Sequence, residues 1–423
     1  MKIAFIVNLF PKLSETFILN QITGLLDMGH EVEIFAEHNP QEEKIQYDVK
    51  KYNLMEKVHY FSIPNSKIKR LLKAIYLIIT NFHKGPLKIL KSLNIFKYRG
   101  KALSLWPLYR IIPFLDKDFD IIQCHYGSYG NIGAYLGQIG LKGKLVTMFH
   151  GCDIRLGIEK GKNIYDQVLK YGVCFLAISD YNYRNIIGFG ADPKKVIFHP
   201  VGIYVDKFPY RKQVNEVKIA KTIIIITVAR LVEEKGIEYG IKAISRLLKS
   251  NNRSNLKYRI IGDGGLEDNL RKLVEELNLS KVVEFLGSME QEEVIKEMLN
   301  SHIFLLPSIS EALPVVLLEA QAVGLPIVST KVGSVSQAII DGKSGFLVPE
   351  RNVDALAEKL GYLIEHPELW SEMGRYGRIF VEEKYDVKKL NKRLVQVYQN
   401  ILQEGQLNLN DLKMKSKARS VVV

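Results

Sequence analysis

The chain has 423 residues, which is more than one ordinary hydrophobic core accommodates and therefore predicts two domains. Hydrophobic residues make up 47% and charged residues 25% of it, so the composition excludes an intrinsically disordered chain. The longest apolar runs, such as residues 223–226, are far shorter than the roughly 18 residues that span a membrane. The apolar amino-terminal stretch is short and no small-residue cleavage site follows it, so we interpret it as a strand rather than a signal peptide.

The cysteines indicate a reducing environment. They are three in number, and no two of them have the spacing of a metal site. We therefore expect reduced thiols in a cytoplasmic protein, at Cys124, Cys152 and Cys174.

The positive charge is concentrated in one segment. The net charge is +13, yet residues 57–115 contain twelve lysine and arginine residues and no acidic residue. Four more basic residues lie between Lys413 and Arg419. Basic residues gathered in this way predict a surface that meets an anionic partner.

The first part of the chain predicts a strand at residues 2–8, a helix from Ser14 to about Met28, and a strand at 31–36. Ser14 fits the N-cap of the helix, whose apolar residues recur at helical spacing. Where a strand leads into a helix in a parallel sheet, the connecting residues lie at the mouth of a ligand-binding crevice. An ordinary capped helix is the alternative. The connecting residues include Lys12, Ser14, Glu15 and Thr16.

The acid-free segment predicts two basic amphipathic helices, at residues 68–80 and 86–95, in which lysines are mixed with apolar residues. Aromatic residues follow at Trp106, Tyr109 and Phe114. This composition is typical of segments that bind a membrane surface. A solvated helical face is the alternative. Nucleic acid is disfavoured, because the helices are too apolar and no nucleic-acid module is recognisable.

Further strands complete the first half, and one of them ends in a histidine. They are expected at residues 119–124, 145–149, 173–178 and 196–198, with a helix at 131–139. His150 directly follows the second of them, at the edge where parallel sheets bind ligands. A functional imidazole is therefore expected there, and a buried structural histidine is the alternative. Residues 210–221 are polar and irregular, which suits a linker.

The second half repeats the alternation of strands and helices. Strands are expected at residues 222–228, 258–261, 282–286, 303–306, 327–329 and 345–348, and helices at 266–277, 291–299, 353–365, 369–383 and 387–402. Arg230 and Lys235 follow the first of these strands, and a glycine turn that contains Gly262 and Asp263 follows the second. Exposed basic residues at a strand end and a plain turn are the alternatives to a binding site.

Two glutamates flank the start of a helix expected within residues 306–349. Glu311 lies just before this helix, Pro314 fits its first turn, and Glu319 lies about a turn and a half inside it. A helix start behind a strand favours a phosphate, and carboxylates beside it accept hydrogen bonds from hydroxyls. The stretch therefore predicts a site for a nucleoside diphosphate linked to a sugar. The alternative is a capping box of Ser308 and Glu311 with a solvated Glu319.

These residues resemble a known family. The run Glu311-Ala-Leu-Pro-Val-Val-Leu-Leu-Glu319, with the glycine, proline and valine positions that follow it up to Pro349, looks like the donor-site signature of glycosyltransferase family 4. The run from Pro11 to Ile22 is similar to exopolysaccharide glycosyltransferases of the colanic acid and amylovoran type. The resemblance covers nearly the whole chain and implies an α/β fold with two Rossmann-like domains facing each other across a cleft, the GT-B fold.

The resemblance also implies a domain organisation. Residues 1–203 would form a Rossmann-like acceptor-binding domain, and residues 204–385 a Rossmann-like domain for the nucleotide-sugar donor. Residues 386–423 would form a C-terminal helix that packs back toward the first domain, followed by a basic tail. The active site would lie between the two domains.

Roles for individual residues follow from the same resemblance. The catalytic positions would be His150 near the reacting carbon, Arg230 and Lys235 at the donor diphosphate, and Glu311 at the hydroxyls of the donor sugar. The other donor-binding positions would be Gly262, Asp263, Ser308, Ala312, Leu313, Pro314, Val315 and, at the ribose, Glu319. The acceptor-side candidates are Lys12, Ser14, Glu15, Thr16 and, as an orienting partner of His150, Asp153. Two positions depart from the family pattern, with Ala312 in place of a frequent glycine and Gln337 in place of a frequent glutamate.

The implied reaction is the transfer of a hexose-type sugar from a nucleotide diphosphate sugar to an acceptor hydroxyl, with retention at the anomeric carbon. Neither a metal nor a cofactor is implied, because Arg230 and Lys235 can supply the positive charge. The implied acceptor is a polyprenyl-diphosphate-linked glycan, and residues 57–115 would hold the protein peripherally at the anionic inner face of the plasma membrane. Two alternatives are a nucleotide-sugar 2-epimerase-like isomerase and a non-catalytic sugar-nucleotide-binding subunit of a polysaccharide assembly complex.

Overall fold

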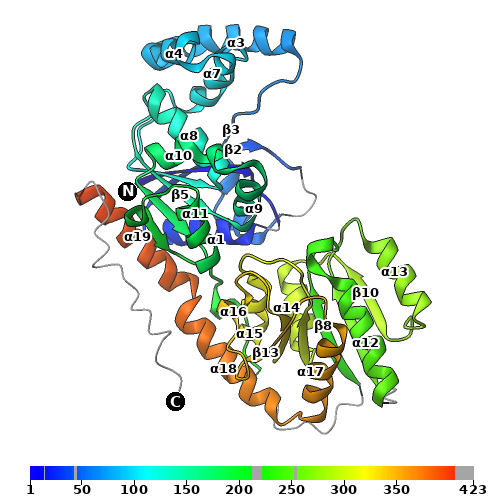
Figure 1. Ribbon diagram of the computed structural model, residues 1–423. Coiled ribbons are helices and arrows are strands. Elements are labelled where there is room, and N and C mark those ends of the chain that lie inside the picture. The colour runs from blue at the N-terminus through cyan, green and yellow to red at the C-terminus, as the bar shows by residue number, and fades with distance from the viewer. Residues whose placement is uncertain (14, 42–44, 212–221, 252–254, 405–423) are drawn as a thin grey trace. The chain divides into compact units, whose positions relative to one another are not determined.

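The computed structural model describes residues 1–13, 15–41, 45–211, 222–251 and 255–404 (Figure 1). The chain divides into two compact units, one formed by Met1–His199 with the chain from Asn391 onward, and the other by Pro200–Leu390. Each unit is built on a parallel β-sheet with packed helices. The predicted α/β class with two Rossmann-like halves is therefore confirmed.

The sheet of the first unit has seven parallel strands in the order β3-β2-β1-β4-β5-β6-β7. These strands are β1 (Lys2–Leu9), β2 (Glu31–His38), β3 (Val58–Tyr60), β4 (Ile121–His125), β5 (Lys144–Phe149), β6 (Cys174–Ala177) and β7 (Val196–Phe198). The strand order reverses between β1 and β4, where Ile3 pairs with Ile121. Open parallel sheets bind ligands beyond the carboxyl ends of their strands at such a reversal. The ends of β1 and β4 therefore mark the functional edge of this unit.

Helices cover both faces of this sheet. The helices of this unit are α1 (Thr16–Asp27), α2 (Tyr47–Lys51), α3 (Lys67–Asn81), α4 (Pro86–Ser92), α5 (Ile95–Tyr98), α6 (Gly100–Leu103), α7 (Trp106–Ile111), α8 (Gly127–Ile139), α9 (Gly151–Lys160), α10 (Asp166–Tyr171), α11 (Asp180–Gly188) and most of α19 (Val387–Glu404). On one face α8 lies so close that a Cβ at Gly133 would sit 2.8 Å from Cys124 Sγ. On the other face Tyr398 of α19 donates a hydrogen bond to Gln123 Oε1 (3.0 Å). Neighbouring residues of a strand point to opposite faces, so β4 is buried on both sides.

The segment of residues 57–115 is more divided than the sequence predicts. It begins with β3, which has three residues and is too short for a periodic pattern to reveal. Helix α3 matches the first expected helix, but the second expected helix ends at Ser92. Asn94 Oδ1 accepts a hydrogen bond from Lys97 N (2.9 Å) and thereby caps a new helix, α5.

The sheet of the second unit has six parallel strands in the order β10-β9-β8-β11-β12-β13. These strands are β8 (Ile223–Val228), β9 (Leu256–Ile261), β10 (Val283–Gly287), β11 (Ile303–Leu306), β12 (Ile327–Thr330) and β13 (Gly345–Val348). The helices of the unit are α12 (Ile237–Asn251), α13 (Glu267–Glu276), α14 (Gln291–Leu299), α15 (Val315–Val323), α16 (Val335–Ala338), α17 (Val353–Glu365) and α18 (Leu369–Lys384). The strand order reverses between β8 and β11, so the functional edge of this unit lies at their carboxyl ends.

Some local predictions differ from the structure. Pro314 is the N-cap residue of α15 rather than a residue of its first turn, since the helix begins at Val315. Helix α9, directly after His150, was not predicted. Residues 212–221 of the expected linker and the expected tail from residue 405 lie outside the described residues.

Candidate active site

In the second unit, three predicted residues converge beyond β8 and β11. Lys235 Nζ lies 2.6 Å from Glu311 Oε1, and Ser308 Oγ donates a hydrogen bond to the same oxygen at 2.8 Å. The Glu311 side chain is 7% exposed and the Lys235 side chain 19% exposed, so water screens this ion pair only weakly. Because Ser308 bonds a carboxylate rather than a helix amide, the capping-box alternative is not realised. Within the described chain Glu311 Oε2 carries no hydrogen bond, which leaves it for the hydroxyl of a ligand.

Arg230, at the same strand ends, takes no part in this ion pair. It follows β8, its side chain is exposed, and its guanidinium has no ion-pair partner among the residues that the structure describes. A guanidinium presents a planar fork of N–H donors that matches the oxygens of a phosphate. Arg230 is therefore free to bind an anion.

Helix α15 begins beside Glu311. Pro314 precedes its first turn, in which Leu317 N donates to the carbonyl oxygen of Pro314 (3.1 Å), so the amides of Val315 and Val316 are the ones left without an acceptor inside the helix. These amides and the helix dipole favour a negative charge. The predicted residues of this approach are buried at Leu313 and Pro314 and half-buried at Ala312 and Val315.

Glu319 lies in the second turn of α15 and is partly exposed. Burial raises the pKa of its carboxyl to about 7, against a hydrogen bond from Gln291 that lowers it. Gln291 Nε2 lies 3.4 Å from Glu319 Oε1, which makes this a weak contact. The carboxyl is thus poised to accept a hydrogen bond from a ligand hydroxyl once it is ionised.

Two glycines bring the loops of this edge together. Gly333 has a φ of +51°, and a Cβ there would lie 1.6 Å from the carbonyl oxygen of Glu311. Gly262 has a φ of +134°, and a Cβ there would lie 2.0 Å from the carbonyl oxygen of Ala229. Only glycine permits these approaches, so the loop after β12 supports Glu311 and the turn after β9 supports the segment that carries Arg230. Asp263, the next residue of that turn, accepts a hydrogen bond from Leu231 N through its carbonyl and from Ser288 Oγ through its carboxylate.

In the first unit, His150 occupies the N-cap position of α9, directly after β5. Its Nε2 lies 3.1 Å from Nδ1 of His125, the last residue of β4. The rings of Phe17 and Tyr126 each lie 4.7 Å from the His150 ring, centroid to centroid. Burial lowers the pKa of His150 to about 3 and that of His125 well below its usual value, so both imidazoles are neutral at physiological pH.

Asp153 fixes the backbone around His150. Its Oδ2 accepts a hydrogen bond from His150 N and its Oδ1 from Gly127 N, both at 2.9 Å. It is buried, and this burial raises the pKa of its carboxyl to about 7 in spite of the two hydrogen bonds. Asp153 thus ties the start of α9 to the start of α8 and contacts His150 through its main chain.

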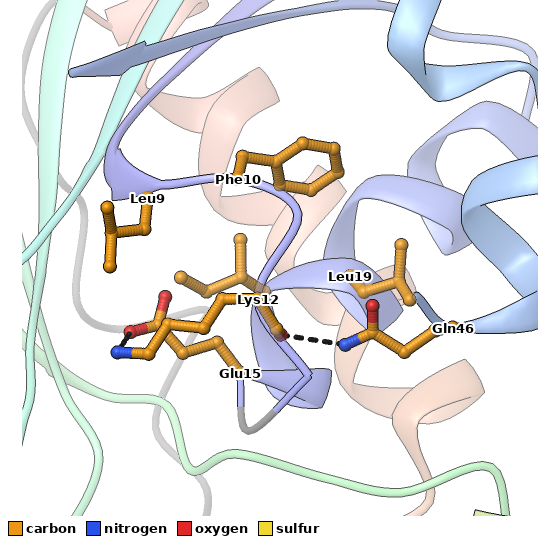
Figure 2. A pocket seen from close by; sticks show the side chains of 7 residues that line it. Leu9, Phe10, Lys12, Glu15, Leu19 and Gln46 are labelled. Atoms are coloured by element: carbon orange, nitrogen blue, oxygen red, sulfur yellow. Dashed lines mark hydrogen bonds and ion pairs between the residues drawn. The ribbon is translucent and has the colours of Figure 1, made fainter. Parts of the chain in front are cut away.

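The acceptor-side candidates form a second cluster, at the end of β1. Lys12 Nζ donates a hydrogen bond to Glu15 Oε1 at 2.9 Å (Figure 2). Tyr126 Oη donates to the same oxygen, also at 2.9 Å. Glu15 Oε2 is buried and has no hydrogen-bonding partner within the described chain. Gln46 Nε2 donates to the carbonyl oxygen of Lys12 (2.7 Å). The small cavity beside these residues has about 10 Å³, enough for a single water molecule.

Two further candidates complete this loop. Thr16 is the first residue of α1 and is half-buried, and Ser14 lies outside the described residues. The sequence reasoning missed His125 and Tyr126, because the strand expected at 119–124 ends one residue early. The rule that singled out His150, a polar residue at a strand end, would have found both.

The described part of the chain holds no group of three or more His, Cys, Asp and Glu side chains in the arrangement of a metal site. Comparison with known proteins identifies the class to which this protein belongs. The model of Glycosyltransferase Family 4 matches residues 14–207, and that of Glycosyl transferases group 1 matches residues 210–380.

Individual relatives agree with these family models. WcaL of Salmonella typhimurium, a glycosyltransferase assigned to colanic acid biosynthesis, is 34% identical over 416 residues, which are 95% of this chain and 100% of WcaL. The amylovoran biosynthesis glycosyltransferase AmsK of Erwinia amylovora is 34% identical over 371 residues, which are 84% of this chain and 89% of AmsK. The crystal structure of Anabaena HepE in complex with UDP has a TM-score of 0.68 at 16% identity, covers 95% of this chain and 100% of HepE, and supports the fold.

The two parallel-sheet units, with basic and acidic side chains gathered at their strand ends, define a glycosyltransferase of the GT-B fold. The chain belongs to glycosyltransferase family 4, and its relatives place it among the enzymes of exopolysaccharide biosynthesis. The resemblance that the sequence suggested is therefore confirmed.

Proposed function

We propose that this protein transfers a sugar from a nucleotide diphosphate sugar to an acceptor hydroxyl, with retention at the anomeric carbon and without a metal ion. The observation that carries this proposal is the shielded Lys235–Glu311 pair beside the unpaired Arg230 and the start of α15. Cations, helix amides and a carboxylate with a free oxygen are the groups that a diphosphate joined to a sugar requires.

Each group has a role in the proposed reaction. Negative charge builds up on the diphosphate as the glycosidic bond breaks, and Arg230 and Lys235 stabilise it. Glu311 Oε2 accepts a hydrogen bond from a sugar hydroxyl, while Lys235 and Ser308 hold Oε1 in place. The leaving phosphate helps to deprotonate the acceptor hydroxyl, which attacks the same face of the sugar. His150 contacts the reacting sugar, and Glu319 the ribose.

The test measures release of the nucleoside diphosphate. The wild type is incubated with UDP-, GDP- and ADP-sugars, with and without a membrane lipid extract, beside Lys235→Ala and Glu311→Ala. Lys242→Ala is the control, because Lys242 forms an exposed pair with Glu238 on α12. We expect release from one donor, dependent on lipid, intact in the control and lost in both site variants.

Other outcomes would contradict the proposal in different ways. Lipid-independent release of free sugar would indicate epimerase-like chemistry or hydrolysis. Nucleotide binding without turnover, with every donor and with lipid present, would indicate a non-catalytic subunit. The donor panel also identifies the nucleotide.

The proposed acceptor is a polyprenyl-diphosphate-linked glycan in exopolysaccharide or cell-surface polysaccharide synthesis. The relatives named for colanic acid and amylovoran biosynthesis support this assignment. Lys12, Glu15 and Thr16 would then face the acceptor. An acceptor of this kind is embedded in a membrane, so the enzyme must reach a lipid surface.

An exposed apolar stripe on α3 supports such a membrane contact. Ile68, Leu72, Tyr76 and Ile79 recur at helical spacing and are between 63% and 73% exposed. Lysines and arginines of the acid-free segment lie on the same helices, for example Lys69 and Lys73 on α3. No helix of the described ranges has the length and apolar content to cross a bilayer. We therefore propose that α3 and its neighbours lie in the surface of an anionic leaflet, where each basic residue contributes about 1 kcal/mol.

Vesicle flotation tests this contact. The wild type should float with phosphatidylglycerol-containing vesicles, less with purely zwitterionic vesicles, and Ile68→Glu combined with Ile79→Glu should remain in solution. Ile158→Glu is the matched control, because Ile158 is also an exposed isoleucine (57% exposed) but lies on α9, outside the stripe. Equal flotation of the double variant and the control would contradict a role for the stripe.

A further inference from the structure

The pair of buried histidines in the first unit has a feature that the proposed reaction does not use. His125 is fully buried at the end of β4, and its ring lies between Phe5, at 5.6 Å, and His150, at 5.3 Å, measured between centroids. The ring planes are inclined by 22° and 17°, so the three rings are nearly parallel. His125 is therefore packed as part of the core and also bonded to the neighbouring imidazole.

The hydrogen bond between the two rings determines where a proton lies. Both imidazoles are neutral, so each carries one N–H and one lone pair. Of the two facing nitrogens, His125 Nδ1 and His150 Nε2, one must donate and the other accept across 3.1 Å. Phe17 and Tyr126 fix the plane of the His150 ring, and the capping box of α9 sets the amide of Asp153 against the same side chain.

A purely structural role fits His125 poorly. Its second nitrogen, Nε2, is buried and has no hydrogen-bonding partner in the described chain. An unpartnered polar atom in a dry interior is unfavourable, and an apolar ring would fill the same space without it. The bond to His150 is the compensating contact, which points to a role in the site rather than in the core.

We propose that His125 is a positioning residue that holds His150 in one tautomer and one orientation for sugar transfer. This inference rests on the proposed contact of His150 with the reacting sugar. The hydrogen bond couples the tautomers of the two rings, so His150 cannot move its proton to its other nitrogen unless His125 moves its own proton as well. A ring that can flip or change tautomer would spend part of its time in the wrong state.

A measurement on the unaltered enzyme tests the hydrogen bond. The protein is labelled with ¹⁵N-histidine, and its imidazole signals are recorded between pH 5.5 and pH 8, with His150→Gln and His125→Asn used to assign them. We expect a single neutral tautomer for His150 over this range and a scalar coupling between the two facing nitrogens. Two interconverting tautomers, or the absence of the coupling, would overturn the proposal, and this result does not depend on the folding of any apolar variant.

Kinetics test the consequence for transfer. His125→Leu removes the bond, and we expect kcat to fall about tenfold to a hundredfold with less than a threefold change in the KM of the nucleotide sugar, the scale of a slightly misplaced reacting group. His125→Asn keeps a polar atom near the position of Nδ1 and should restore part of kcat. His302→Asn is the control, because it removes another buried histidine, which lies in the second unit and accepts a hydrogen bond from Ile224 N.

The outcomes separate the two proposals. Wild-type kcat in His125→Leu together with an unchanged His150 tautomer would overturn the positioning role. Wild-type activity of His150→Ala would instead refute the proposed contact of His150 with the sugar. A fall of kcat in His302→Asn equal to that in His125→Leu would show that the loss reflects the removal of a buried histidine and not the bond to His150, and would also overturn the positioning role.

Discussion

The two units each place a lysine–glutamate pair beyond their strand ends, and the surroundings of the two pairs differ. In the second unit Lys235 and Glu311 (2.6 Å) lie beside the exposed, unpaired Arg230 and the start of α15. In the first unit Lys12 and Glu15 (2.9 Å) lie beside Tyr126 and two neutral histidines. Arg230 therefore gives the second edge a cation that no carboxylate pairs with in the described chain, while the lysine–glutamate pair of the first edge is balanced and lies among aromatic rings. Similar ion pairs on similar sheets thus suit a charged ligand in one unit and a neutral, hydroxyl-bearing ligand in the other.

Removing each lysine gives the largest expected contrast. Lys235→Met should lower kcat about a hundredfold to a thousandfold, because it removes a cation from the developing charge of the diphosphate. Lys12→Met should leave the KM of the nucleotide sugar unchanged and act on the acceptor. Steady-state kinetics with both substrates varied measures the two effects. If both variants raised the KM of the nucleotide sugar to the same extent, the proposed difference between the two edges would be wrong.

A Gly333 variant tests how the loops at the strand ends of the second unit are held together. Gly333→Ala should destabilise the fold by about 2–3 kcal/mol and lower activity, because its Cβ would collide with the carbonyl oxygen of Glu311. Gly342→Ala is a matched control, with a φ of +73° and no atom within 4 Å of its Cβ. Chemical denaturation compares the two variants. Equal losses of stability would mean that strain in φ, and not the contact with Glu311, accounts for the effect.

A Glu15 variant tests the acceptor-side assignment of the residues at the strand ends of the first unit. Glu15→Gln keeps the shape but removes the charge that Lys12 and Tyr126 bind, and we expect a rise of about tenfold in the KM of the acceptor. Hydrolysis of the nucleotide sugar in the absence of acceptor should not change. Tyr126→Phe removes one of the two hydrogen bonds and should give a smaller effect. A change confined to the KM of the nucleotide sugar would contradict the acceptor-side assignment.

Glu319 gives the smallest effect, which depends on pH. Burial raises the pKa of its carboxyl to about 7, and the ionised carboxylate accepts a stronger hydrogen bond from a ribose hydroxyl than the neutral carboxyl does. The carboxyl is mostly protonated at pH 6 and mostly ionised at pH 8, so the affinity for a nucleoside diphosphate should rise a few-fold between these values, and at most about tenfold. Calorimetry of the wild type and Glu319→Gln isolates this contribution from the titration of the phosphate. The same pH dependence in both proteins would exclude Glu319 as its source.

The sequence predicted the second unit more closely than the first. Its strands are short β-branched runs such as Ile223–Val228, which are typical of buried parallel strands, and the expected ranges differ from the observed ones by a few residues at most. In the first unit β3 has only three residues, and the strand before His125 was expected to end at Cys124. Short or polar strand ends carry too little periodicity to be located.

The sequence identified the residues of the candidate site but not the contacts between them. Lys235, Ser308 and Glu311 were all identified, but nothing in the sequence states that Lys235 and Ser308 bind the same oxygen of Glu311. This contact forms only when the loop of Gly333 packs against the backbone of Glu311, and that packing is a property of the folded chain. The His125–His150 bond was missed for the same reason, since it joins residues 25 positions apart on neighbouring strands.

Helix α19 has a consequence for the order in which the protein is made. Its Tyr398 and Ile401 are fully buried in the first unit, and Asn391 Nδ2 donates to the carbonyl oxygen of Asn20 (2.9 Å). A ribosome makes these residues after the whole second unit. Amino-terminal domains usually fold first during synthesis. Here the unit whose translation begins first lacks part of the cover on one face of its sheet until the second unit has been made. Its folding therefore depends on α19, and a premature stop before residue 391 would destabilise the first unit.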